Sequence, residues 1–282
     1  MTYPSKIYLN GKIVDQQDAK ISVFDRGFIF GDGLYEVMVQ INGTFFYKKA
    51  HLERLQSGLH KINIKYDLSS ISEEIDKLLE ASELTQKDCL LYIQITRGVA
   101  PRQHSFPKDI QPTVMMYAVP KVLPAINAVH AQVITREDFR WSRCDIKMTS
   151  LLGNVMLNEE AMQHNCYETV LVRDGVVTEA SHCNVFFVKD GVVYTHPANQ
   201  LILDGISRQI VLELCEHLNI EVIQEPVAVE NITQMDEAFL TGTSTQIASI
   251  QKIDDHNYYV GGKVGPITQH LQNAFLELKS RK

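Results

Sequence analysis

Four Asn-Gly or Asp-Gly pairs constrain the fold of this chain more than any other feature, because each stands between two short apolar runs. A type I′ turn requires positive φ at both central residues, and asparagine or aspartate followed by glycine tolerates this best. Each pair therefore predicts a β-hairpin. The pairs are Asn10-Gly11, Asn42-Gly43, Asp174-Gly175 and Asp190-Gly191.

Helical periodicity lies between and after these hairpins. Apolar residues recur at spacings of three and four, which is typical of a helix with one buried face. Pro266 suits the first position of the last such segment. Two further segments are rich in apolar residues and are typical of strands. We predict helices at residues 50–63, 71–81, 205–218 and 266–279, and strands at 90–98 and 112–119.

The length and the order of these elements predict an α+β fold with two domains. A chain of 282 residues, 45% hydrophobic, exceeds the usual size of one domain and has ample material for a core. Residues 119–129 contain two prolines and no clear periodicity, so they are the predicted linker. We expect an α+β N-terminal domain at 1–118 and a larger, strand-rich C-terminal domain at 130–282.

Charge and cysteine content argue against several classes of protein. The net charge of −7 and the pI of about 5.8 disfavour nucleic-acid binding through a broad basic surface. Five scattered cysteines without a C-x-x-C motif argue against a disulfide framework or a structural zinc site. No signal-peptide core opens the chain, and no apolar run approaches the roughly 18 residues of a membrane helix. We expect a cytoplasmic protein without membrane or nucleic-acid partners.

Lys147 is the first candidate for chemistry. It lies in RCDIKMTSLLGN (143–154), where no helix face explains it. Taken alone, such a lysine is most simply a surface charge. A lysine that forms a Schiff base needs a carbonyl, which pyridoxal 5′-phosphate (PLP) supplies together with a phosphate and a pyridine nitrogen.

The chain offers partners for each part of such a cofactor. LDGISR (203–208) runs from a turn into a predicted helix, whose first N–H groups can bind a phosphate. TGTST (241–245) adds N–H and hydroxyl donors. Arg54 can pair with a phosphate, and Glu179 with a pyridine nitrogen. Each group taken alone also has an ordinary explanation, as a helix cap or a solvated charge.

Several blocks together resemble the class IV aminotransferases, also called fold type IV of the PLP enzymes. The resemblance extends over nearly the whole chain and implies the two-domain fold type IV architecture, with a smaller N-terminal domain and a larger PLP-binding C-terminal domain. The blocks are FDRGFIFGDGLYEV (24–37), HLERLQSG (51–58), RCDIKMTSLLGNV (143–155), VVTEASHCNVFFV (176–188), LILDGISR (201–208) and LTGTSTQIASI (240–250).

The resemblance implies a role for each matched residue. Lys147 would be the Schiff-base lysine and would move the substrate α-proton. Glu179 would pair with the pyridine nitrogen, and Leu203 would pack against the cofactor ring. The implied phosphate ligands are Arg54, Ile206, Ser207 and Thr243, the isoleucine through its backbone.

Within the family, QITRGVAPRQHSFP (94–107) resembles the D-amino acid aminotransferases. The resemblance implies that Arg102, His104 and Tyr35 bind the substrate α-carboxylate, for which a bidentate guanidinium is well suited. It also implies that this loop serves the neighbouring subunit, so the active unit would be a homodimer. We expect ping-pong transamination between D-amino acids, such as D-alanine and D-glutamate, and 2-oxo acids, such as pyruvate and 2-oxoglutarate.

Departures from the family pattern concern specificity. His182 and Cys183 stand where relatives commonly carry small hydroxyl residues, and Gly242 stands where a hydroxyl residue can occur. These changes remove no catalytic group.

Three alternatives stay open. A branched-chain L-amino acid aminotransferase or an aminodeoxychorismate lyase is disfavoured by the Arg102-x-His104 pair. A non-catalytic ligand-binding module is disfavoured by the intact set of Lys147, Glu179 and Arg54. A metal enzyme is disfavoured because no H-x-x-x-H pair stands beside an acid, so no metal ligand is predicted.

Overall fold

A computed structural model describes residues 3–280 and shows an α+β protein with two compact units. The N-terminal unit contains the chain up to Val122 together with Ile146–Ser150. The C-terminal unit contains Leu123–Asp145 and the chain from Leu151 onward. Lys147 thus groups with the N-terminal unit, although the division predicted from sequence assigns its segment to the C-terminal domain.

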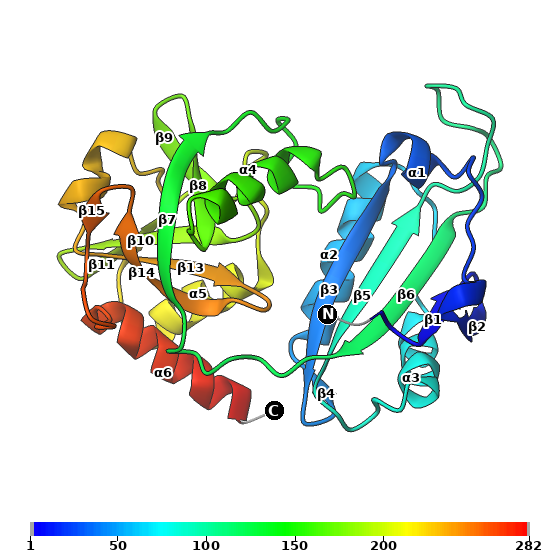
Figure 1. The fold of residues 1–282 in the computed structure, drawn as a ribbon, viewed down its shortest axis with the longest axis horizontal. Helices are drawn as coiled ribbons and strands as arrows, with labels where there is room; N and C mark the ends of the chain where they lie inside the picture. Colours follow the sequence, from blue (N-terminus) through cyan, green and yellow to red (C-terminus); the bar gives the residue numbers. More distant parts are fainter. Residues whose placement is uncertain (1–2, 281–282) are drawn as a thin grey trace. The chain divides into compact units, whose positions relative to one another are not determined.

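The N-terminal unit is an antiparallel sheet with helices packed against it (Figure 1). Its strands are β1 (Lys6–Leu9), β2 (Lys12–Asp15), β3 (Gly33–Ile41), β4 (Thr44–Phe45), β5 (Cys89–Thr96) and β6 (Thr113–Pro120). Its helices are α1 (Arg26–Phe30), α2 (Lys48–Lys61) and α3 (Ile71–Ala81), with a 3₁₀ turn at Gln16–Asp18. Within residues 3–280 the strand order is β2-β1-β6-β5-β3-β4.

The two faces of β3 differ in burial. Leu34 and Met38 are buried in a core that includes Leu55 of α2 and Ile75 of α3. Because side chains alternate along a strand, Tyr35 lies on the opposite, partly exposed face. This alternation orients Tyr35 away from the helices.

The C-terminal unit contains a mixed sheet with helices (Figure 1). Its strands are β7 (His130–Glu137), β8 (Glu168–Arg173), β9 (Val176–Ala180), β10 (Asn184–Lys189), β11 (Val192–Thr195), β12 (Val222–Ile223), β13 (Glu237–Gly242), β14 (Gln246–Ile253) and β15 (His256–Asn257). Its helices are α4 (Leu152–Gln163), α5 (Ile206–His217) and α6 (Pro266–Ser280), with a 3₁₀ helix at Val229–Gln234.

The order of the C-terminal sheet in the described chain is β12-β11-β10-β13-β14-β7-β8-β9, and β15 pairs with β14. Strand β7 runs parallel to both β14 and β8. Buried residues of β10, β13 and β14, such as Phe187, Leu240 and Ile250, lie in one core cluster.

All four predicted hairpins are confirmed. They join β1 to β2, β3 to β4, β8 to β9 and β10 to β11. Both residues of each pair have positive φ, for example 49° at Asn10 and 85° at Gly11. The predicted helices and strands are also confirmed as α2, α3, α5, α6, β5 and β6, with ends shifted by at most two residues.

Helices α1 and α4 lack the sequence pattern that predicts the others. Helix α1 has five residues and depends on its ends, where the Asp25 carboxylate accepts from Gly27 N–H and Gly31 adopts φ of 66°. In α4 the buried residues are Leu157 and Ala161, while Leu152 and other apolar residues are exposed. Its apolar residues therefore form no single stripe.

The predicted linker begins in the last residues of β6 and continues through irregular backbone and turns at 121–129. No helix in residues 3–280 is long and apolar enough to cross a membrane.

Candidate active site

The predicted site residues are distributed over the two units. Tyr35, Arg54, Arg102, His104 and Lys147 belong to the N-terminal unit, and Glu179, Leu203, Ile206, Ser207 and Thr243 belong to the C-terminal unit.

Lys147 is held against the partly exposed face of β3. The Tyr35 N–H donates to the Lys147 carbonyl at 3.0 Å, and the Thr149 N–H donates to the Gly33 carbonyl at 3.0 Å. These bonds place the Lys147 amine 3.2 Å from the Tyr35 hydroxyl and 4.3 Å from the centre of its ring. Lys147 is therefore an oriented amine rather than a mobile surface charge.

Tyr35 is itself fixed by stacking. Its ring lies 5.7 Å from that of Tyr92, which in turn lies 5.0 Å from that of Tyr117. Offset stacking of aromatic rings restricts their rotation. The Tyr92 hydroxyl donates to Gln94, so its own orientation is also set.

Arg54 is oriented by a buried carboxylate on the core face of β3. Its guanidinium donates to both oxygens of Glu36, at 3.0 and 2.7 Å, and His51 Nδ1 lies 3.0 Å from the same carboxylate. Burial opposes the charge on Glu36, yet Arg54 and His51 hold its pKa well below the usual range. Burial lowers the pKa of His51. The guanidinium of Arg54, the predicted phosphate ligand, is thus held in place by the buried Glu36 carboxylate.

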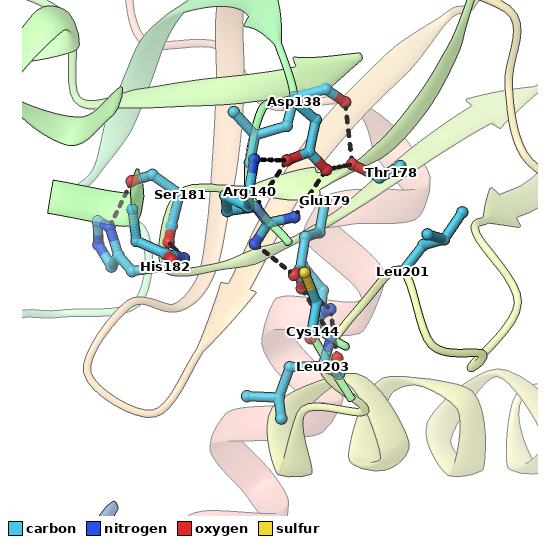
Figure 2. Close-up of polar contacts among 12 residues, drawn as sticks. Asp138, Arg140, Cys144, Thr178, Glu179, Ser181, His182, Leu201 and Leu203 are labelled. Carbon is cyan, nitrogen blue, oxygen red and sulfur yellow. Dashed lines mark hydrogen bonds and ion pairs between the residues drawn. The ribbon is translucent and has the colours of Figure 1, made fainter. Parts of the chain in front are cut away.

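Glu179 of β9 is the centre of a buried polar network (Figure 2). One carboxylate oxygen accepts from Arg140 at 2.7 Å, and the other accepts from the Leu203 N–H and the Asn184 amide, both at 3.1 Å. Asp138 accepts two further bonds from Arg140, at 2.9 and 3.0 Å. The network fixes the Glu179 carboxyl on both sides.

Burial decides the ionisation of Glu179. Loss of solvation raises its pKa to about 7, although Arg140 and the Leu203 N–H act in the opposite direction. A carboxyl group with this pKa can share a proton with a pyridine nitrogen near neutral pH.

The start of α5 has the properties of an anion site. Gly205 is the N-cap residue and supplies no side-chain cap, so the N–H groups of Ile206 and Ser207 begin the helix without intrahelical partners. A Cβ on Gly205 would lie 2.2 Å from the Asn184 Oδ1 atom. Close approach of Asn184 therefore requires glycine at the N-cap.

The TGTST segment follows β13 and presents several hydroxyl groups. Thr243 is partly exposed, whereas Thr241 is buried and its hydroxyl has no partner among the described residues. A buried hydroxyl without a partner is a feature that a bound phosphate would explain. Gly242 is packed against Cys183 and Thr245, which explains why a larger residue is absent there.

Arg102 and His104 lie together in the exposed loop after β5. Both contact the ring of Phe30 in α1: the Arg102 guanidinium lies 5.3 Å from its centre, and the His104 ring 5.7 Å. Arg26 donates to the carbonyl of Gln103 at 2.6 Å and so fixes the loop between them. The predicted pair is therefore presented to solvent as a unit.

Sequence reasoning missed the residues that orient these groups. Glu36 did carry a signal, because a carboxylate in the apolar run LYEVMV needs a buried partner. Arg140 and Asp138 carry none, since their segment has no periodicity that distinguishes it from a loop. Asn184 lies in a matched block, at the start of β10, but the resemblance assigns it no role.

The donors present fit PLP, with an amine for its aldehyde, a buried carboxyl for its ring nitrogen, and an uncapped helix start with hydroxyl groups for its phosphate. The family model described as "Amino-transferase class IV" matches residues 33–253. The chain is a class IV aminotransferase. It is a PLP-dependent enzyme, as its family requires.

The similarity to individual relatives extends over nearly the whole chain. The chain is 39% identical over 277 residues to "D-alanine aminotransferase" of Staphylococcus epidermidis, covering 96% of each chain. It is 38% identical to "D-alanine aminotransferase" of Bacillus licheniformis, covering 95% of each. Among solved structures, the branched-chain amino acid aminotransferase of Escherichia coli matches with a TM-score of 0.90 and 23% identity, covering 98% and 95% of the two chains. That likeness shows that the fold is shared.

Proposed function

We propose that this class IV aminotransferase transfers amino groups between D-amino acids, such as D-alanine and D-glutamate, and 2-oxo acids, such as pyruvate and 2-oxoglutarate. The observation that carries the proposal is the exposed Arg102 and His104 pair on Phe30. Relatives 39% identical over 96% of their length, named D-alanine aminotransferases, support the same substrate class.

Lys147 is the proposed base. When bound, PLP supplies an aldehyde that an amine can hold and a ring that accepts the electron pair left at the substrate Cα. The Lys147 amine accepts the α-proton and later returns it. Tyr35 orients the amine through the 3.2 Å contact of its hydroxyl.

Glu179 is the proposed partner of the pyridine nitrogen. Its pKa of about 7 lets it hold a proton with that nitrogen at neutral pH, and Arg140 keeps the carboxyl oriented. Phosphate ligation is assigned to Arg54, Thr243 and the start of α5, namely Ile206 and Ser207, and ring packing to Leu203.

Arg102, His104 and Tyr35 are the proposed ligands of the substrate α-carboxylate. A guanidinium with a neighbouring imidazole and phenol can bind a carboxylate by several charge-assisted hydrogen bonds. Holding this end of the substrate leaves one enantiomer with its α-hydrogen directed at Lys147. The family resemblance favours the D-enantiomer.

A homodimer is the proposed active unit, with the Arg102 loop serving the partner subunit. Large apolar side chains are exposed on both units, and such surfaces mark interaction sites. They include Phe24, Phe28 and Phe106 in the N-terminal unit and Trp141, Leu152 and Val155 in the C-terminal unit. A cytoplasmic location is proposed from the five free cysteines, which suit a reducing compartment.

The substrate class is tested with purified, PLP-loaded enzyme. We expect 2-oxoglutarate-dependent conversion of D-alanine to pyruvate, with ping-pong kinetics, and little reaction of L-leucine. Lys147→Ala should abolish transamination. Arg102→Ala should weaken the binding of D-alanine by about 2–5 kcal/mol, which is the scale for losing one partner of a desolvated charge pair. Reaction with L-leucine alone would instead identify a branched-chain aminotransferase.

Sharing of the site is tested by mixing the two variants and assaying them at a D-alanine concentration too low for Arg102→Ala to turn over on its own. Arg102→Ala and Lys147→Ala subunits are unfolded together and refolded. A mixed dimer has one complete site if Arg102 serves the partner, so random pairing should restore about a quarter of the wild-type activity. No recovery, with dimers present by light scattering, would show that Arg102 acts within its own subunit.

A further inference from the structure

Glu168, His182 and Cys183 form a cluster that the proposed reaction does not use. Glu168 opens β8, and the other two lie in the connection between β9 and β10. Each offers one atom that can bind a metal, and these atoms all lie within 4.8 Å of one another. The cluster combines a carboxylate oxygen, an imidazole nitrogen and a sulfur.

The Glu168 carboxylate is held rigidly. It is fully buried and accepts hydrogen bonds from the Ser181 hydroxyl, from the Thr169 N–H at 3.0 Å and from the His182 N–H at 2.8 Å. Hydrogen bonds of this kind fix the orientation of carboxylates that bind metals in proteins. Glu168 would therefore need little reorganisation to serve as a ligand.

His182 closes one side of the cluster. Its Nδ1 atom lies 2.9 Å from a Glu168 oxygen, and half of its side chain is exposed. This contact brings the imidazole directly against the buried carboxylate. The exposed half of the imidazole places this side of the cluster at the surface of the unit.

Cys183 supplies the third atom. It is a free cysteine, buried, and its sulfur lies 3.3 Å from the Thr245 hydroxyl. As a thiolate it would bind borderline and soft cations much better than Mg²⁺ or Ca²⁺, which prefer oxygen ligands only.

We propose that Glu168, His182 and Cys183 bind a zinc ion. Three protein ligands of the N, O and S types are typical of Zn²⁺, with a fourth position left for water at the exposed side. The inference does not depend on the substrate class proposed above.

The ion would brace the turn that adjoins Glu179. Ser181, His182 and Cys183 connect β9, which carries Glu179, to β10, which begins with Asn184, and the Ala180 N–H donates to the Cys183 carbonyl at 2.7 Å. The site has no sequence motif, because Glu168 lies far from the other two ligands in the chain and meets them only in the folded unit.

Zinc binding is tested on the PLP-loaded enzyme. The protein is dialysed against Zn²⁺ in a weak chelating buffer, and bound zinc per chain is measured by mass spectrometry. We expect one zinc per chain, and X-ray absorption should show one sulfur ligand at about 2.3 Å. Cys183→Ser and His182→Asn should each weaken binding at least tenfold.

Cys166→Ser is the matched control, because Cys166 is the partly exposed free cysteine and lies two residues after His164. It should bind zinc like the wild type. Thermal unfolding and the absorption of bound PLP show that each variant is folded. The proposal is overturned if the wild type binds no zinc, or if Cys183→Ser and His182→Asn bind it as tightly as Cys166→Ser does.

Discussion

Arg140 donates a 2.7 Å hydrogen bond to Glu179, and the two side chains are only 5% and 6% exposed. Even so, burial raises the pKa of Glu179 to about 7. The arginine therefore does not hold this carboxyl fully ionised. The arginine lowers the pKa of Glu179 relative to the value that loss of solvation alone would give it.

Arg140→Met should shift the pH dependence of activity. Without the guanidinium, the pKa of Glu179 rises further, so the carboxyl stays neutral to higher pH and the cofactor ring loses a negative partner. The pH at half-maximal kcat should move upward, with a lower kcat at pH 7. Stability should fall by about 3–5 kcal/mol, because Asp138 also loses a buried partner.

Arg143→Met is the control for this prediction. Arg143 lies in the same segment but is 43% exposed, and it pairs with Asp145. Its removal should leave the pH profile unchanged. If the Arg140→Met profile also superimposed on that of the wild type, Glu179 would not be the group that sets it.

Tyr35→Phe should distinguish the contribution of the Tyr35 hydroxyl to the Lys147 site from that of the Tyr35 ring. The variant loses the hydroxyl 3.2 Å from the amine but keeps the ring contact at 4.3 Å. A hydrogen bond to a charged group is worth about 1.5–3 kcal/mol, so kcat/KM for D-alanine should fall roughly 10- to 100-fold. Tyr92→Phe, which removes a hydroxyl one ring further along the stack, should change it much less. Equal losses in the two variants would contradict a direct role of the Tyr35 hydroxyl.

Glu36→Gln should change how stability depends on pH. The pKa of Glu36 lies below its ordinary value of 4.5 in the folded state, so the unfolded chain binds more protons below that pH. The stability that Glu36 provides is thus complete above pH 4.5 and is lost as the pH falls further. Urea unfolding should show a deficit of about 3–5 kcal/mol at pH 7, because Arg54 loses a buried partner, and a smaller deficit in acid.

Glu53→Gln is the control, because Glu53 is a surface glutamate of the same unit, in α2. Glu53 is 66% exposed and lies 3.8 Å from Lys49. Exposed pairs contribute about 0–1 kcal/mol, so this variant should follow the wild type at every pH. A constant deficit of Glu36→Gln down to low pH would show that the carboxylate charge is not what stabilises the unit.

The hairpins could be predicted because their information is local. Asn10 and Gly11 specify a turn whatever surrounds them, and the spacing of Leu52, Leu55 and Leu59 specifies a helix face. Helix α4 could not be predicted, since its exposed apolar residues hide the period of the buried ones.

In the candidate site, too, the locally encoded residues could be predicted and the long-range contacts could not. Lys147 and Glu179 were found by resemblance, which matches short blocks of sequence. The contacts that orient them are not predicted in this way, because Arg140 reaches Glu179 across 39 positions of the chain. Tyr35 is identified as a carboxylate ligand by the resemblance, but its contact with Lys147 spans 112 positions and is not. Such contacts depend on strand register and on the packing of the segments against each other, and no local pattern encodes either.

Gly205→Ala should damage the site without removing a polar group. The new Cβ would lie 2.2 Å from Asn184 Oδ1, so the Asn184 side chain must move, and its amide binds both Glu179 and the Leu203 carbonyl. We expect PLP affinity to fall at least tenfold and stability to fall by about 1–3 kcal/mol, as in overpacked cores. Spectral titration with PLP and thermal unfolding measure the two effects.

Gly153→Ala is the matched substitution elsewhere in the same unit. Gly153 lies in α4, and a Cβ there would meet its nearest neighbour, Arg140 Cγ, at 3.4 Å, an ordinary contact. Alanine is the better helix former by about 1 kcal/mol, so this variant should be as stable as the wild type or more so, with unchanged PLP affinity. If both alanine variants bound PLP normally, the close approach of Asn184 to the N-cap of α5 would not be needed to hold the cofactor.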